Sequence, residues 1–157
     1  MDEKKYRPNV GLMLVNNDGK VWIGTRVNSE DYGYRHQMPQ GGIDKGETPL
    51  ETAYRELWEE VGISKDKVEL IKQSDHWYQY DFFRPYQYPD DLYHGQKQKW
   101  FLFRFKGTDA DFDLEINPQE IEFSSFSWMD IDSVIDLVVP FKREVYTAVF
   151  KEFKPYI

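Results

Sequence analysis

Apolar and polar residues alternate with a period of two in several stretches of this chain, a pattern that predicts β-strands. The predicted strands cover residues 6–16, 20–27, 67–80, 96–105 and 123–129, with a short extended segment over 35–42. Asn17, Asp18 and Gly19 form a strong hairpin signal between the first two stretches. We therefore expect the first two strands to pair in antiparallel fashion.

The stretch 96–105 has two different faces. One face is basic at its beginning and apolar at its end, and it carries Lys97, Lys99, Phe101, Phe103 and Phe105. The other face carries Gln98, Trp100, Leu102 and Arg104.

Residues 84–95 contain three tyrosines, two prolines and two aspartates without clear periodicity. They predict a long loop, a candidate cover for a substrate, and 28–34 predict a shorter polar loop.

Helix signals are strongest between residues 48 and 62. Thr48 suits the N-cap, Pro49 suits the first helical position, where its missing N–H costs nothing, and Glu51 completes a capping box. Gly62 can adopt the left-handed conformation that ends a helix. The predicted buried stripe of this helix consists of Leu50, Ala53, Leu57 and Val61.

Two further helices are predicted near the C-terminus. A short helix covers 131–138 and is stopped by Pro140, and a longer helix covers 141–153 with Val145, Val149 and Phe153 as its buried stripe. The sequence contains no internal repeat and no linker. The fold class is therefore α/β (α+β), with a mixed β-sheet sandwiched between helices.

Glu56, Glu59 and Glu60 stand at positions i, i+3 and i+4 of the predicted helix, which places three carboxylates side by side. The positive charge of Arg55 neutralises only part of the negative charge of these three glutamates. A divalent cation that prefers oxygen ligands, Mg²⁺ or Mn²⁺, would stabilise this cluster. The alternative is an acidic helix face exposed to water, since glutamate is a good helix former.

The surrounding stretch 41–63 resembles the Nudix box, G-x5-E-x7-R-E-U-x-E-E-x-G-U, where U is aliphatic. The seven invariant places are filled by Gly41, Glu47, Arg55, Glu56, Glu59, Glu60 and Gly62. The resemblance implies that Glu56, Glu59 and Glu60 hold catalytic metals at a site that includes Gly41. It also implies that Arg55 and Glu47 orient these glutamates.

Length and composition fit one domain, 1–157. The 157 residues can bury one sizeable core, and the absence of cysteine removes thiol catalysis and disulfides. No apolar run of signal-peptide or membrane-span length occurs, so we expect a cytoplasmic protein without a membrane partner. The net charge of −8 argues against sequence-independent coating of nucleic acid, and we expect no DNA partner. The oligomeric state is left open.

Several basic and aromatic residues are candidates for substrate binding. Residues 92–108 carry four basic residues and no acid, whereas 109–122 carry six acids and no base. A local cationic region beside a metal site suits a polyphosphate, although a strand with exposed lysines would look the same. The candidates are Arg7, Arg26, Lys97, Lys99, Lys142 and, for stacking on a base, Phe141.

Segments outside the box narrow the resemblance to one bacterial branch of the Nudix family. These segments are YRPNVG, MPQGG, GQKQKWFLF, PFKREVY and VFKEF. The branch includes RNA pyrophosphohydrolases and dinucleoside polyphosphate hydrolases, and the resemblance implies that Glu122 is a further carboxylate near the metals. Ile121, Phe126 and His36 depart from the branch pattern, which leaves base binding less defined than the metal site.

The resemblance implies Mg²⁺- or Mn²⁺-dependent hydrolysis of a phosphoanhydride. The favoured substrate is a 5'-triphosphate or 5'-diphosphate RNA end, which would be converted to a 5'-monophosphate. The alternatives are a dinucleoside polyphosphate as substrate, or a sensor that binds nucleotide without turnover. Glu59 or Glu60 is the expected general base, with Glu122 as competitor.

Overall fold

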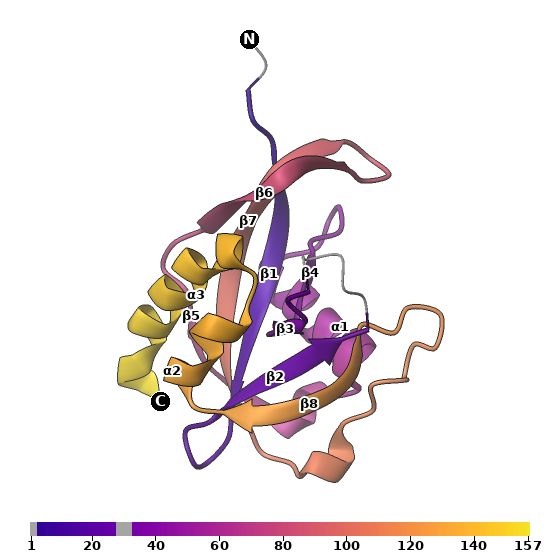
Figure 1. Cartoon of the computed structure of the whole chain (residues 1–157). Coiled ribbons are helices and arrows are strands. Elements are labelled where there is room, and N and C mark those ends of the chain that lie inside the picture. Colours follow the sequence, from indigo (N-terminus) through magenta and orange to yellow (C-terminus); the bar gives the residue numbers. More distant parts are fainter. Residues whose placement is uncertain (1–2, 28–32) are drawn as a thin grey trace.

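The computed structural model describes residues 3–27 and 33–157 and shows a mixed β-sheet with helices on both faces (Figure 1). In these residues the strands are β1 (Tyr6–Val15), β2 (Val21–Arg26), β3 (His36–Gln37), β4 (Gln40–Gly42), β5 (Val68–Gln73), β6 (Tyr78–Gln87), β7 (Leu92–Phe105) and β8 (Phe123–Met129). The α-helices are α1 (Pro49–Val61), α2 (Ile131–Val134) and α3 (Pro140–Phe153). Short 3-10 helices are η1 (Lys65–Lys67), η2 (Asp109–Asp111), η3 (Ile135–Leu137) and η4 (Lys154–Tyr156). Of the loop predicted over 28–34, residues 28–32 lie outside the described residues.

The sheet is mixed because one of its central pairs is parallel. The main strand order is β3-β2-β1-β7-β5, and β4, β6 and β8 pair with β1, β7 and β2. Strands β1 and β7 run parallel along the whole of β1, from Tyr6 opposite Gly95 to Val15 opposite Arg104. The predicted antiparallel pairing of the first two strands is confirmed, with Val15 opposite Val21.

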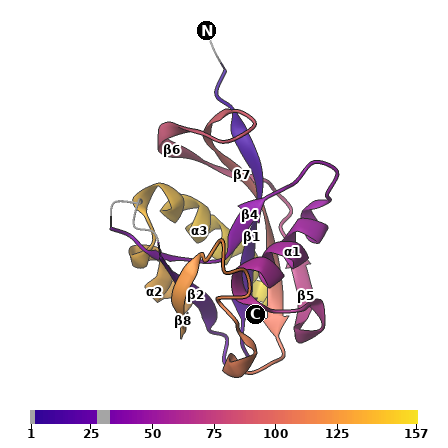
Figure 2. The same cartoon turned by 90° about the vertical axis from the view of Figure 1, so that its right-hand side faces the viewer.

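Strict alternation along the central strands produces two separate apolar clusters, one on each face. On β1, Leu12 and Leu14 face α1, whereas Met13 and Val15 face α2 and α3. Figure 2 shows α1 on one side of the sheet and α2 and α3 on the other. The sheet is therefore sandwiched between helices, as the sequence predicts.

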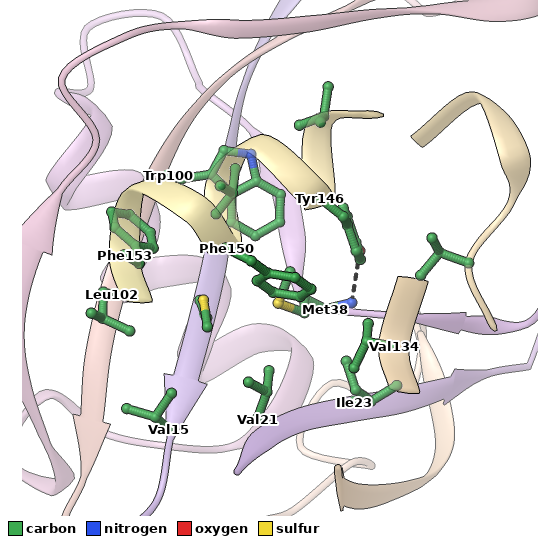
Figure 3. Packing of buried hydrophobic residues seen from close by; sticks show 14 of the residues in the cluster. Val15, Val21, Ile23, Met38, Trp100, Leu102, Val134, Tyr146, Phe150 and Phe153 are labelled. Atoms are coloured by element: carbon green, nitrogen blue, oxygen red, sulfur yellow. Dashed lines mark hydrogen bonds between the residues drawn. The ribbon is translucent and has the colours of Figure 1, made fainter. Parts of the chain in front are cut away.

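The cluster beneath α3 is built from large side chains that are fully enclosed (Figure 3). The indole of Trp100 packs edge-on against the ring of Tyr146, with the ring centroids 5.5 Å apart. The Tyr146 hydroxyl accepts a hydrogen bond of 2.9 Å from the backbone N–H of Met38. This bond ties α3 to the segment between β3 and β4, which forms one wall of the site described below.

Helix α1 begins and ends where its capping residues predict. The Thr48 side chain accepts a hydrogen bond from the Glu51 backbone N–H, and the Glu51 carboxylate accepts one from the Thr48 backbone N–H, both at 3.2 Å. Gly62 ends the helix with φ of 70° in the left-handed region. Ala53, Leu57 and Val61 are fully buried against the sheet. Their burial fixes the rotation of α1 about its axis and so determines where the glutamates of the helix point.

Two predictions on the central part of the chain are wrong. The single strand predicted over 67–80 is divided into β5 and β6, because Ser74 turns the chain: its Oγ donates to the carbonyl of His76 and accepts from the Trp100 N–H. The long loop predicted over 84–95 is mostly a hairpin, in which β6 and β7 extend as an arm at the top of Figure 1.

No helix in the described part of the chain is both long enough and apolar enough to span a bilayer.

Candidate active site

Arg55, in the middle of α1, joins the carboxylate of Glu47 before the helix to those of Glu56 and Glu59 further along it. Its Nε lies 2.8 Å from Glu47 Oε2, and its Nη1 lies 2.8 Å from Glu56 Oε1 and 3.1 Å from Glu59 Oε2. Its Nη2 also donates to the carbonyl of Gly42 at 3.0 Å. The guanidinium holds the pKa of Glu47 down at about 2, so this carboxylate stays ionised and fixes the arginine in turn.

Glu56 and Glu60 are buried acidic side chains on the same helix. Burial raises the pKa of Glu56 to about 7, against the opposing effect of Arg55 and with a further contribution from Glu59. Burial, the charge of Glu56 and the charge of Glu122 raise the pKa of Glu60 well above its usual range. The Oε2 atom of Glu60 has no hydrogen-bond partner. For both carboxyl groups, burial therefore outweighs the nearby positive charge, which is Arg55 for Glu56 and Arg26 for Glu60.

Gly41 allows Glu56 to lie directly against strand β4. A Cβ atom at position 41 would fall 2.1 Å from the carboxyl carbon of Glu56, so a larger residue would displace the carboxylate. The glycine thus contributes to the acidic site by having no side chain.

Glu122 approaches the same site from the segment that leads into β8. Its carboxylate lies 3.1 Å from Arg26 Nε, and its carbonyl accepts from the Val27 N–H at 3.0 Å. After burial and the charge of Glu56, the Glu122 carboxylate is a further cause of the raised pKa of Glu60. The fold therefore brings Glu122, just before β8, toward the acids of α1, which lie more than sixty residues away in the sequence.

Clustered carboxylates with too little positive charge fit a hard divalent cation. The burial of Glu56 and Glu60 and the unpartnered Oε2 of Glu60 support this fit. Among residues 3–27 and 33–157, however, no three acidic or histidine side chains already stand close enough together to enclose an ion. Arg55 lies between Glu56 and Glu59 instead.

Next to these acids lies a cleft of about 600 Å³. Of the predicted site residues, it is lined by Arg7, Arg26, Gly41, Glu60, Glu122, Phe141 and Lys142. Glu47, Arg55, Glu56 and Glu59 do not line it and lie behind β4 or along α1. Of the predicted residues, the cleft therefore combines one end of the acidic cluster with three basic side chains and one aromatic ring.

The basic residues of the cleft are held by specific contacts. The Arg7 guanidinium lies 4.4 Å from the ring centroid of Tyr88, a cation–π contact. Lys142 is buried, and its Nζ donates to Gln37 Oε1 at 2.8 Å. Phe141 stacks on Tyr80 with ring centroids 5.6 Å apart. These contacts orient both cations before any phosphate arrives.

Lys97 and Lys99 do not line the cleft. Their Nζ atoms lie 5.7 and 5.6 Å from the ring centroid of Trp77. The period of two explains their position, because they share a face with Phe101 on the α1 side, whereas Gln96 lies on the opposite face and lines the cleft. The structure thus separates these two lysines from the other predicted substrate-binding residues.

Four amide side chains line the cleft although none was predicted from the sequence: Asn9, Gln37, Gln40 and Gln96. Gln98 and Trp100 lie next to them and set the direction of the Asn9 amide. Trp100 Nε1 can only donate, and it donates to Gln98 Oε1 at 3.0 Å. Gln98 Nε2 then donates to Asn9 Oδ1 at 2.8 Å, which leaves Asn9 Nδ2 without a partner. Gln96 Oε1 likewise has none. In the sequence, only the alternation of Gln96 and Gln98 with Lys97 and Lys99 indicates that these two glutamines lie on the face opposite the lysines.

Comparisons with known proteins show which family this chain resembles. The NUDIX domain family matches residues 5–149. An RNA pyrophosphohydrolase of Roseobacter denitrificans is 42% identical over 156 residues, covering 97% of this chain and 94% of the relative. One of Rickettsia bellii is 44% identical over 155 residues, covering 97% and 92%.

Solved structures share the fold at low sequence identity. A C. elegans Ap4A hydrolase has a TM-score of 0.67 at 18% identity, covering 96% of this chain and 99% of that chain. The E. coli dihydroneopterin triphosphate pyrophosphohydrolase has a TM-score of 0.69 at 19% identity, covering 92% and 97%.

Proposed function

The chain belongs to the Nudix family, and from this premise we propose that it hydrolyses 5'-triphosphate or 5'-diphosphate RNA ends to 5'-monophosphate ends. Members of this family generally need divalent metal ions. We propose Mg²⁺ or Mn²⁺ for this chain, since both prefer carboxylate oxygens. A cytoplasmic location agrees with an RNA substrate.

One observation carries the proposal. The buried Oε2 of Glu60 has no partner, although Glu56 and Glu122 both act on this carboxyl group, and Glu60 lines a cleft with Arg7, Arg26 and Lys142. An acidic cluster suited to cations therefore lies beside a cleft lined by basic side chains. A metal-bound polyphosphate satisfies both needs at once.

The residues of the chain have distinct roles in this reaction. Glu56, Glu59 and Glu60, with Glu122, would hold the divalent ions, which would supply the positive charge that neutralises phosphate oxygens and lowers the pKa of the attacking water. Arg55 and Glu47 position these carboxylates through their mutual ion pair.

Proton transfer and phosphate binding fall to other groups of the cleft. Glu59 or Glu60 accepts the proton of the attacking water, and Glu122 competes for this role. Arg7, Arg26 and Lys142 bind the phosphates that do not react, and Phe141 contacts a base. Lys97 and Lys99 remain candidates only for a part of the RNA that extends past the cleft.

A dinucleoside polyphosphate is the second candidate substrate. The observation that favours it is the aromatic lining of the cleft, where Phe82, Phe83 and Tyr86 could hold a second nucleoside. The third candidate, a nucleotide sensor without turnover, would be expected to have lost a glutamate of the box. All of them are present in this chain.

Product analysis tests the proposal. A short triphosphorylated RNA and diadenosine tetraphosphate or pentaphosphate are compared at equal concentration in one Mg²⁺ buffer, with EDTA as the metal-free control. We expect faster release of phosphate or pyrophosphate from the RNA. A large advantage for the dinucleotides would favour the second candidate, and nucleotide binding without any product would favour the sensor.

A further inference from the structure

Two buried amide atoms lie unpaired among the side chains of the cleft. We call the four amides that line the cleft the amide floor: Asn9, Gln37, Gln40 and Gln96. Nδ2 of Asn9 and Oε1 of Gln96 have no hydrogen-bond partner among the described residues, although these two residues are only 1% and 5% exposed. A buried amide group without a partner costs free energy, and native proteins rarely leave one so. Two such atoms in one cleft make the amide floor a candidate site for a polar group of a ligand.

The direction of each of these two amides follows from its neighbours. Trp100 donates to Oε1 of Gln98, so Nε2 of Gln98 donates in turn, and it meets Oδ1 of Asn9 at 2.8 Å. On Gln96, Nε2 donates to the Tyr80 hydroxyl at 2.9 Å. The amide floor therefore keeps one donor on Asn9 and one acceptor on Gln96.

Asn9 and Gln96 lie on the same face of two neighbouring parallel strands. Asn9 stands opposite Gln98 and Arg7 stands opposite Gln96, so Asn9 and Gln96 are diagonal neighbours across the pair of β1 and β7. A group that binds to both must accept from an amide N–H and donate to an amide oxygen. Phosphate oxygens are acceptors, so this pair does not suit a further phosphate.

The amide floor adjoins the proposed metal site on one side and the proposed base contact on the other. The backbone N–H of Gln40 hydrogen-bonds to the Glu60 carboxylate, and Oε1 of Gln40 lies 3.4 Å from Nε2 of Gln98. Tyr80, which accepts from Gln96, stacks on Phe141. In a nucleotide the sugar joins the phosphates to the base. The position of the amide floor therefore matches that of the sugar.

We propose that Asn9 and Gln96 bind the 2'-hydroxyl of the 5'-terminal ribose, so that the protein distinguishes an RNA end from a DNA end. A hydroxyl accepts and donates, and the 3' oxygen of a nucleotide within a chain is esterified, which leaves the 2'-hydroxyl as the sugar group with this chemistry. Gln98 and Trp100 are positioning residues, because they act through the Asn9 amide. The inference rests on the proposed function, because the 5' end must lie at the acidic cluster for its ribose to reach the amide floor.

The test removes one hydroxyl from the substrate. The kcat/KM values are measured in Mg²⁺ buffer for a triphosphorylated tetranucleotide, for the same chain with 2'-deoxyribose at its first residue, and for the chain with 2'-deoxyribose at its last residue as the matched control. Each substrate is made with adenine and with guanine at the 5' end. The variants are Asn9→Leu, Gln96→Met and Gln98→Leu, with Gln79→Leu as the control at an exposed amide of β6 outside the cleft.

The proposal predicts a loss that depends on a single hydroxyl. The wild type should lose about tenfold or more in kcat/KM when the first residue is 2'-deoxy, because the donor and the acceptor then stay unpaired, and nothing when the last residue is 2'-deoxy. Asn9→Leu and Gln96→Met should hydrolyse the ribose and the first-residue deoxyribose substrates at equal rates. A merely structural role of these residues would lower both rates and keep their ratio.

The positioning role of Gln98 has its own expected result. Gln98→Leu should reduce the discrimination between the two substrates, because the Asn9 amide can then rotate, and it should retain the rate on the first-residue deoxyribose substrate. Gln79→Leu should discriminate as the wild type does.

Three results would overturn the proposal. They are equal wild-type rates on the ribose and the first-residue deoxyribose substrates, which would leave the two amide atoms to a bound water; a preference that follows the 5' base instead of the hydroxyl; and an unchanged ratio in both Asn9→Leu and Gln96→Met.

If no triphosphorylated RNA is hydrolysed, the proposed function fails. The hydroxyl contact is then tested separately by calorimetry in Mg²⁺ buffer with adenosine and 2'-deoxyadenosine 5'-(β,γ-imido)triphosphate. The wild type should bind the ribose form about tenfold more tightly, and Asn9→Leu should bind both forms equally. A wild type that binds the ribose form no more tightly than the deoxyribose form counts against the contact.

Discussion

Replacing Glu56 with glutamine is expected to stabilise the metal-free protein at pH 8, even though it removes a carboxylate proposed to hold metal. The Glu56 side chain is 12% exposed, and its charge is opposed by burial and by Glu59. Glutamine has nearly the same shape and can still accept from Arg55 Nη1 through its amide oxygen. The substitution therefore removes the buried charge and keeps the packing.

The magnitude follows from the pKa of Glu56. This pKa is about 7 in the folded protein and near 4.5 in the unfolded chain, and one pH unit of difference corresponds to about 1.4 kcal/mol. Because the folded state binds the proton more tightly, stability is retained below pH 4.5 and lost as the pH rises through 7. The full loss is about 3 kcal/mol. Glu60 adds a loss in the same direction.

The assay is thermal unfolding in EDTA at pH 5 and at pH 8. For a domain of this size, about 3 kcal/mol corresponds to a Tm difference of roughly 6 to 12 °C. Glu56→Gln should raise Tm at pH 8 by about this amount and change it little at pH 5. Glu144→Gln, at an exposed position of α3, is the matched control and should have no effect.

Added Mg²⁺ tests whether the buried negative charge is what lowers the stability of the wild type at pH 8. Wild type at pH 8 should gain about 2.7 kcal/mol when free Mg²⁺ exceeds its Kd a hundredfold, and Glu56→Gln should gain much less. The reasoning is refuted if the Tm of the wild type and of Glu56→Gln change in parallel between pH 5 and pH 8 in EDTA.

Three further predictions concern turnover. Glu59→Gln should lower kcat at least about a hundredfold with the fold retained, and near-normal Mg²⁺-dependent turnover in the folded variant would count against its role. Glu122→Gln should weaken Mg²⁺ binding in a titration and slow hydrolysis, whereas unchanged affinity and rate would make Glu122 a solvated turn residue. Gly41→Ala should reduce kcat by roughly a hundredfold through displacement of Glu56, with little change in Tm, and full activity would show that the carboxylate position is unimportant.

The sequence predicts α1 to the residue because all of its determinants are local. The capping box at Thr48, the proline at the first position and the left-handed Gly62 each act within one helical turn. The same local geometry places Glu56, Glu59 and Glu60 on adjacent turns of the helix. Glu122 is different, because its approach depends on the pairing of β8 with β2, and only a resemblance to known proteins could indicate it.

The arm could not be predicted because its pairing is irregular. A bulge of several residues with a proline disrupts the period of two that marks a strand. The sequence pattern of this segment therefore predicts a loop. The amide floor was missed for a related reason. Its function depends on the direction of each amide, which Trp100 fixes through Gln98, and no sequence pattern records a hydrogen-bond direction.

Strand β4 links the two halves of the site because two of its residues have no side chain. A Cβ at Gly41 would fall 2.1 Å from Glu56, and a Cβ at Gly42 would fall 2.1 Å from Nη2 of Arg7. Successive residues of a strand point to opposite faces, so the carboxylate and the guanidinium approach the same backbone from opposite sides. Their separation is therefore set by the thickness of one strand. Any side chain at either position would move a proposed metal-holding acid away from a proposed phosphate-binding base.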